Sequence, residues 1–265
     1  MVERLFFKDR WERFFAEFGL TKFDDFFGFS AGDEINRNRK RNVYRLTFGD
    51  SDSQVFFIKR FFKPYLKDMF FACCNFGWGC SQAANEWHNA ELLLNNGIET
   101  YHPVCFGERL RCGMETRSFL ITRQIQGQCL SEFVARHWQQ ISDEKKKQIV
   151  VLLADGIRKM HDAGIDMPDL HIHHIFLIEA ESRLCDIGMI DLHRMKHNCR
   201  GEGFKVRDLA RIHCSMLEKY FTTAQKRLLI EAYAKGNWQG GINRLIAKVE
   251  RLSGSMTARK KQKEY

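Results

Sequence analysis

The sequence predicts an α+β fold of two lobes, a small β-rich N-lobe followed by a helical C-lobe. Residues 43–48 and 55–61 are rich in branched and aromatic side chains, a composition typical of β-strands. From Leu130 onward the apolar residues recur at intervals of three and four, which indicates helices. Because strands come first and helices later, we expect an N-lobe at residues 1–126 and a C-lobe at residues 127–265.

The N-lobe begins with an amphipathic stretch, MVERLFFKDRWERFF, which predicts a short helix. The two strand-like stretches that follow are separated by a turn cluster at residues 49–53, so they predict a β-hairpin. Residues 81–95 have helical spacing, and Gly97 is a natural C-terminal stop. Two more strands are predicted at residues 104–106 and 118–125.

The C-lobe begins with a short helix at residues 130–137 and a longer, buried helix at residues 143–163. A short apolar strand at residues 175–178 and a second apolar segment at residues 189–192 follow. We expect residues 183–186 to connect these two segments. Helices resume at about Val206.

Bulk composition excludes several classes of protein. A hydrophobic content of 44% with 28% charged residues is that of a globular protein rather than a disordered one. The sequence contains no apolar run of about 18 residues, so no membrane span is predicted. The N-terminus also lacks the features of a secretory signal, so we expect a cytoplasmic protein. The nine cysteines include no Cys-x-x-Cys pair, which argues for reduced thiols rather than a zinc ribbon.

Two carboxylates are the first candidates for chemistry. Asp169 follows the buried helix and precedes a short strand, which places it on a loop held by rigid elements. Asp191 lies at the end of the second apolar segment. Two carboxylates in this order can share the work of phosphoryl transfer, because one orients and deprotonates an attacking hydroxyl while the other holds Mg²⁺ against the phosphates.

A lysine completes the arrangement. Lys59 lies on a predicted strand among large apolar neighbours, and a buried ammonium group needs a partner. Glu86 on the following helix is the candidate, with Glu91 as the alternative. A strand lysine tied to a helix carboxylate and directed at nucleotide phosphates is the layout of kinases.

These residues resemble the family of lipopolysaccharide core kinases, the heptose and Kdo kinases with a two-lobed, protein-kinase-like fold. The resemblance covers residues 55–215. It is carried by Phe57-Ile58-Lys59-Arg60-Phe61, by the Asp169 loop with His174 five residues on, and by Ile190-Asp191-Leu192-His193-Arg194. Asn85-Glu86-Trp87 also resembles the family's helix, and Arg207-Asp208-Leu209 resembles the later helix whose Asp braces the catalytic loop.

The resemblance implies ATP and Mg²⁺ as cofactors and a sugar hydroxyl, of heptose or Kdo, as acceptor. Asp169 is then the catalytic residue, Asp191 and His174 hold the metal, and Lys59 paired with Glu86 positions the α and β phosphates. No Gly-rich phosphate loop is present. Arg39 and Arg41, in the basic segment of residues 37–41, are candidates to bind phosphate in its place, or this segment is only a solvated basic loop.

The sequence departs from protein kinases before the catalytic Asp, where Met167-Pro168 replaces the usual His-Arg. Loss of the Arg removes the usual link to a phosphorylated activation loop, so we expect no regulation of that type. Loss of the His removes a structural brace. A catalytically weak or inactive pseudokinase-type binding protein is therefore one alternative, and a kinase for another small-molecule or protein acceptor is a second.

The net charge of +9 predicts an anionic partner. We expect ATP, a lipopolysaccharide precursor and a peripheral contact with the inner membrane through residues 61–78, unless that aromatic stretch belongs to the core. No nucleic-acid recognition motif is visible. Zinc bound by His161, His171, His173 and His174 is disfavoured, because neighbouring strand residues alternate faces.

Overall fold

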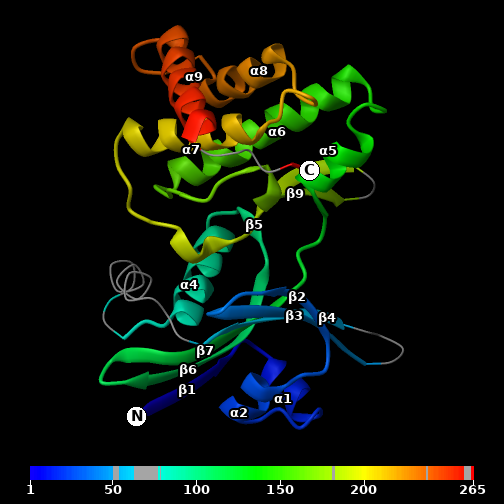
Figure 1. The fold of residues 1–265 in the computed structure, drawn as a ribbon, viewed down its shortest axis with the longest axis vertical. Coiled ribbons are helices and arrows are strands. Elements are labelled where there is room, and N and C mark those ends of the chain that lie inside the picture. The colour runs from blue at the N-terminus through cyan, green and yellow to red at the C-terminus, as the bar shows by residue number, and fades with distance from the viewer. Residues whose placement is uncertain (50–53, 63–76, 78, 181–182, 237, 260–263) are drawn as a thin grey trace. The chain divides into compact units, whose positions relative to one another are not determined.

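The computed structural model describes residues 1–49, 54–62, 77, 79–180, 183–236, 238–259 and 264–265 (Figure 1). The chain forms two compact units: residues 1–92 with 100–125, and residues 93–99 with 126–265. Most of the aromatic stretch at residues 61–78, including Cys73 and Cys74, lies outside the described residues.

The first unit is built on an antiparallel sheet in the order β1-β6-β7-β4-β3-β2. Its strands are β1 (Val2–Phe7), β2 (Asp33–Arg37), β3 (Arg41–Phe48), β4 (Gln54–Phe61), β6 (His102–Arg111) and β7 (Met114–Arg123). Helices α1 (Trp11–Ala16) and α2 (Phe23–Gly28) cover one face, and α4 (Gln82–Asn95) lies on the other (Figure 1).

The two faces of this sheet bury different clusters. Phe15, Phe26 and Phe56 belong to the aromatic core under α1 and α2. Phe61 and Leu120 pack with Ala83 and Ala84 of α4. Because successive residues of a strand point to opposite faces, Lys59 shares the α4 face with Phe61.

The predicted hairpin is confirmed, with β3 and β4 paired from Phe48↔Gln54 to Arg41↔Phe61. The helix predicted at the N-terminus is wrong for residues 2–7, which form a strand paired with β6. The physical reason is that successive side chains point to opposite faces of the sheet. Leu5 and Phe7 pack on the aromatic core, while Phe6 stacks on Phe106 with ring centroids 4.6 Å apart. The helix begins only at Trp11.

The second unit combines a small sheet with five α-helices in its described residues. The sheet has the order β5-β10-β9-β8, formed by β5 (Glu99–Thr100), β8 (Gln128–Cys129), β9 (Ile175–Ala180) and β10 (Arg183–Met189). The helices are α5 (Leu130–His137), α6 (Asp143–Asp162), α7 (Glu202–Ser215), α8 (Thr223–Ala234) and α9 (Ile242–Arg259), with short 3-10 turns η1 (Ile172–His174) and η2 (Leu192–Arg194).

Most of the predicted elements of this unit are confirmed, with α5 at the predicted residues. Residues 183–186 are not the expected connection, because they lie in β10 and pair with β9 across a bulge between Leu184 and Asp186. Of the second predicted apolar segment, residues 189–192, only Met189 belongs to a strand, because β10 ends there. Val206 lies inside α7, which already begins at Glu202.

Helix α6 packs closely against β10, the strand that leads to Asp191. At Gly156, in the middle of α6, an added Cβ would lie 2.4 Å from Cγ1 and Cδ1 of Ile187. Gly156→Ala is therefore expected to lower the free energy of unfolding by about 1–3 kcal/mol, because the helix and the strand must separate. Urea denaturation of the purified protein measures this change.

The matched control is Gly254 in α9, where an added Cβ meets nothing within 4 Å. Gly254→Ala is expected to stabilise the protein by about 0.5–1 kcal/mol through helix propensity alone. Equal effects of the two substitutions would contradict the packing of α6 on β10.

In the described part of the chain, no helix combines the length and the apolar character needed to cross a membrane.

Candidate active site

The first unit contains the expected ion pair between Lys59 and Glu86. Lys59 Nζ lies 2.6 Å from Glu86 Oε1, and the two side chains are 16% and 2% exposed. The Tyr101 hydroxyl donates to the other carboxylate oxygen, Oε2, at 3.4 Å. Burial makes each charge costly without the other, so strand β4 and helix α4 hold a fixed ammonium group on this face of the sheet.

The basic segment of residues 37–41 forms the turn between β2 and β3. Asn38 closes this turn, because its side-chain Oδ1 accepts from the backbone N–H groups of Lys40 and Arg41, both at 2.9 Å. Arg39 is exposed at the tip, and Arg41 is half-buried at the start of β3. The side chains of Arg39 and Arg41 therefore extend from a closed hairpin turn in the first unit.

Asp169 and His174 lie together in the second unit. The loop after α6 turns at Met167, whose carbonyl accepts from Leu170 N at 2.9 Å. His174 Nδ1 lies 2.9 Å from the carbonyl oxygen of Asp169, and since a carbonyl can only accept, Nδ1 carries the proton. The other ring nitrogen, Nε2, is 3.7 Å from Asp191 Oδ2.

Asp191 follows β10 with a left-handed backbone, φ 64° and ψ 58°, a conformation uncommon outside glycine. Its Oδ1 is 2.9 Å from His193 Nδ1, and His193 Nε2 is 3.8 Å from Asp169 Oδ2. Arg194 Nη1 approaches Asp169 Oδ1 at 3.4 Å. The imidazole of His193 thus lies between the two carboxylates.

His193 and Arg194 have contacts that sequence reasoning did not assign. The triplet Leu192-His193-Arg194 was part of the motif, but no role followed from it. The missing information was the short 3-10 turn η2, which directs the side chains two and three positions after Asp191 back toward the carboxylates. A histidine and an arginine two and three residues after Asp191 were the available signal.

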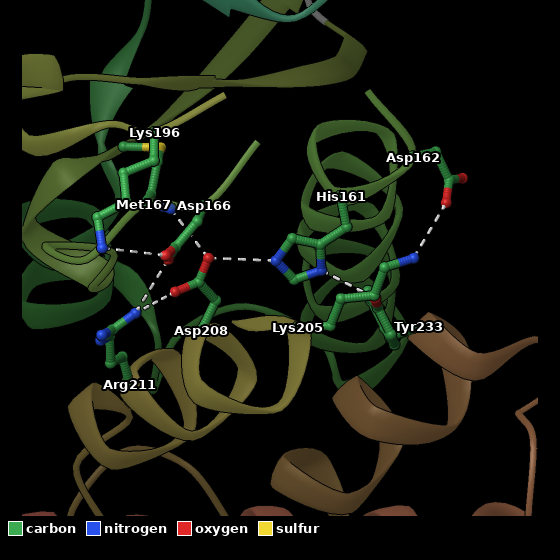
Figure 2. A network of polar contacts seen from close by, with 9 residues as sticks. All are labelled: His161, Asp162, Asp166, Met167, Lys196, Lys205, Asp208, Arg211 and Tyr233. Atoms are coloured by element: carbon green, nitrogen blue, oxygen red, sulfur yellow. Dashed lines mark hydrogen bonds and ion pairs between the residues drawn. The ribbon is translucent and has the colours of Figure 1, made fainter. Parts of the chain in front are cut away.

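A buried polar network supports the loop that carries Asp169 from α7 (Figure 2). Asp208 Oδ2 accepts from the backbone N–H of Met167 at 3.0 Å and lies 3.2 Å from His161 Nε2. Arg211 bonds to Asp208 and lies 3.4 Å from Asp166 Oδ1. The brace expected from Asp208 is present, and it acts on the backbone of Met167.

The tautomer of His161 follows from its neighbours. Because a carboxylate can only accept, His161 Nε2 donates to Asp208, and in the neutral ring Nδ1 accepts from the Tyr233 hydroxyl at 2.8 Å. Burial raises the pKa of Tyr233. Burial, together with the nearby Asp208 carboxylate, also raises the pKa of Asp166. The network therefore ties α6, α7 and α8 to the loop that carries Asp169.

The expected strand geometry of the histidines near Asp169 is wrong. His173 and His174 lie in the 3-10 turn η1 rather than on a strand, so the alternation of strand faces does not apply to them. The rings of His171 and His174 are 3.9 Å apart. His161 instead belongs to the buried network with Asp208 and Tyr233.

The residues around Asp191 fit Mg²⁺ shared with phosphates. His174 Nε2 faces Asp191 Oδ2 at 3.7 Å, and Mg²⁺ would be held by these two atoms. Within the described residues, no three His, Cys, Asp or Glu side chains form a metal cage. Mg²⁺ commonly takes one or two protein ligands and completes its shell with water and phosphate. The metal-binding roles of Asp191 and His174 remain predictions.

The fold shows which structural class the protein belongs to. The structure of WaaP in complex with acyl carrier protein aligns over 96% of this chain and 99% of that one, with a TM-score of 0.71 and 21% sequence identity. This similarity confirms the predicted α+β, protein-kinase-like fold.

The family follows from the sequence. The model of the lipopolysaccharide kinase (Kdo/WaaP) family matches residues 33–233, and the chain belongs to this family. It is 26% identical over 157 residues to the lipopolysaccharide core heptose(I) kinase WaaP of Pseudomonas aeruginosa, and 30% identical over 117 residues to that of Escherichia coli K12. These matches cover 57% and 42% of this chain, and the chain spans 59% and 44% of the two relatives' lengths.

Proposed function

We propose that this chain is an ATP-dependent kinase that phosphorylates a sugar hydroxyl, of heptose or Kdo, in the lipopolysaccharide inner core. The observation that carries the proposal is the His193 bridge between Asp169 and Asp191, in a chain that belongs to the lipopolysaccharide kinase family. Relatives named core heptose(I) kinase favour heptose over Kdo as the acceptor sugar.

Asp169 is the catalytic residue of this proposal. Its Oδ2 is buried, lies 3.8 Å from His193 Nε2 and accepts no hydrogen bond from the described residues, so this oxygen has unused hydrogen-bonding capacity for an acceptor hydroxyl. It orients that hydroxyl and takes its proton as the oxygen attacks the γ-phosphorus of ATP. Arg194 and His193 hold the carboxylate in place from either side.

The remaining roles concern ATP. Asp191 and His174 hold Mg²⁺, which neutralises phosphate charge when bound. Lys59, fixed by Glu86, pairs with the α and β phosphates, and Arg39 and Arg41 bind phosphate from the hairpin turn. The reaction takes place at the cytoplasmic face of the inner membrane, where a lipid-linked precursor requires a peripheral contact.

The pseudokinase alternative rested on Met167-Pro168. The brace of the catalytic loop is nevertheless supplied, because the backbone N–H of Met167 binds Asp208 and needs no particular side chain at position 167. The loop therefore keeps its support without the usual His, which favours an active enzyme.

The test is transfer of labelled phosphate from ATP to purified inner-core oligosaccharide. Wild type is expected to label the oligosaccharide in the presence of Mg²⁺. The double variant Lys59→Met/Glu86→Gln removes both charges together, so no buried charge is left alone. It is expected to lower kcat/KM for ATP roughly 10- to 100-fold, the value of a hydrogen bond to a charged group.

Lys8 and Glu91 supply the matched control. Lys8 follows β1 and Glu91 lies on α4; they form a second Lys–Glu pair at 2.8 Å, with side chains 38% and 30% exposed. Lys8→Met/Glu91→Gln is expected to leave kcat/KM for ATP unchanged. Equal losses in both double variants would remove Lys59 and Glu86 from the nucleotide site, and no labelling by wild type would refute the proposed function.

A further inference from the structure

The segment that follows Asp191 is strongly basic. Between Leu192 and Gly201 the chain carries Arg194, Lys196 and Arg200 with no acidic residue. Arg200 is exposed, and the side chains of Arg194 and Lys196 are 44% and 42% exposed. We call residues 194–200 the basic arm.

The basic arm is held in place by backbone contacts with the catalytic loop. Asp166 and Lys196 exchange two backbone hydrogen bonds, each of 2.9 Å, and Cys199 N donates to Gly164 O at 2.8 Å. Figure 2 shows Lys196 beside Asp166, at the edge of the buried network. The charged side chains of the arm therefore extend from a fixed backbone.

The basic arm also reaches the catalytic carboxylate. Arg194 Nη1 lies 3.4 Å from Asp169 Oδ1, and Lys196 Nζ lies 3.9 Å from Asp166 Oδ2. A sugar that presents its hydroxyl to Asp169 therefore has its neighbouring groups close to Arg194, and Lys196 and Arg200 lie two and six residues further along the same arm. The cations assigned to the nucleotide, Lys59 and the hairpin arginines, belong to the first unit, so the basic arm is an additional positive group.

We propose that the basic arm binds carboxylate or phosphate groups on the sugars that flank the acceptor hydroxyl. The inference rests on the proposed function and assigns residues of the arm to the acidic groups of its oligosaccharide acceptor. Lys196 and Arg200 are the specificity-determining residues, whereas Arg194 also touches the catalytic carboxylate. Guanidinium and ammonium groups suit both anions.

The test uses the full chain with Lys196→Gln and Arg200→Gln combined. The anchoring of the arm is through its backbone, and Arg211 still pairs with Asp166, so the fold is expected to persist. With intact inner-core oligosaccharide, KM for the acceptor is expected to rise about tenfold, or ~1.4 kcal/mol, while kcat stays within about twofold. Added salt is expected to raise the wild-type KM more than that of the variant.

The control removes the same charge elsewhere on the same unit. Arg244 and Arg251 are exposed on α9, and Arg244→Gln/Arg251→Gln is expected to leave KM unchanged. Equal KM values in the two double variants would overturn the inference and leave the proposed function standing.

Modified acceptors show whether the basic arm binds a carboxylate or a phosphate group. Carboxyl-reduced and dephosphorylated inner-core oligosaccharides are compared as substrates, and the group whose removal abolishes the difference between wild type and variant is the one recognised. A difference that survives removal of both groups would overturn the inference.

Calorimetric measurement of oligosaccharide binding without ATP tells a failure of the basic-arm proposal from a failure of the proposed function. Binding weakened by Lys196→Gln/Arg200→Gln alone, with no phosphoryl transfer by wild type, would refute the proposed function and support the basic arm. Binding that is equal in all three proteins would refute the basic arm.

Discussion

Asp169→Asn is expected to lower kcat for phosphoryl transfer roughly 100- to 10,000-fold, the contribution typical of a general base. Asparagine keeps the size of the side chain but cannot accept the proton of the acceptor hydroxyl. KM for ATP is expected to change little, because the residues assigned to the nucleotide are untouched. Steady-state kinetics with the inner-core oligosaccharide measures both quantities.

Asp162 provides the control for this substitution. It lies at the end of α6, with its side chain 65% exposed and 3.8 Å from Lys205 Nζ. Asp162→Asn is expected to retain the wild-type kcat. If Asp169→Asn kept kcat within about threefold of wild type, Asp169 would not be the base.

Asp208→Ala is expected to lower the free energy of unfolding by roughly 3–5 kcal/mol, the cost of leaving a buried charge without its partner. The carboxylate is fully buried, and its removal leaves Arg211, His161 and the N–H of Met167 without their shared acceptor. Because Met167 is two residues before Asp169, kcat of the remaining folded protein is expected to fall as well. Urea denaturation and kinetics below the transition measure the two effects.

Glu231→Ala is the matched control for Asp208→Ala. Glu231 pairs with Arg227 at 2.9 Å, and both side chains are more than 40% exposed, so its loss is expected to cost less than about 1 kcal/mol. A similar small loss for Asp208→Ala would mean that the buried network does not support the loop.

The fold was predictable from the sequence where local signals decide the structure. Helix α6 begins after Ser142, whose hydroxyl accepts from Lys145 N at 3.2 Å, and such a cap is visible in the sequence. Strand β1 was missed because its charged residues suit either element, and its partner β6 lies about a hundred residues further along the chain. Strand β10 was missed at its polar start because pairing with β9, not composition, extends it.

The candidate site was predictable where a motif names the residues. The Lys59–Glu86 pair was expected from a strand lysine and a helix carboxylate, and the structure contains it. The contacts of His161 were not predictable, since Tyr233 lies 72 residues away and Asp208 lies 47 residues away. Local sequence patterns suggest candidate site residues, whereas the contacts of His161 depend on how three helices pack.

The position of the basic arm was likewise not predictable from the sequence. Its charges are visible in the sequence, but their position beside the loop that carries Asp169 depends on the backbone pairing of Asp166 with Lys196. In this structure Asp166 and Lys196 exchange two backbone hydrogen bonds, and Arg211 Nη1 lies 3.4 Å from Asp166 Oδ1.

Mass spectrometry of the core oligosaccharide tests the central claim most directly. Cells lacking the gene are complemented with wild type or with Asp169→Asn, and the phosphate content of the inner core is compared. We expect wild type to restore a phosphate on an inner-core sugar and Asp169→Asn not to restore it. A phosphate content that is the same with wild type, with Asp169→Asn and without the gene would contradict it.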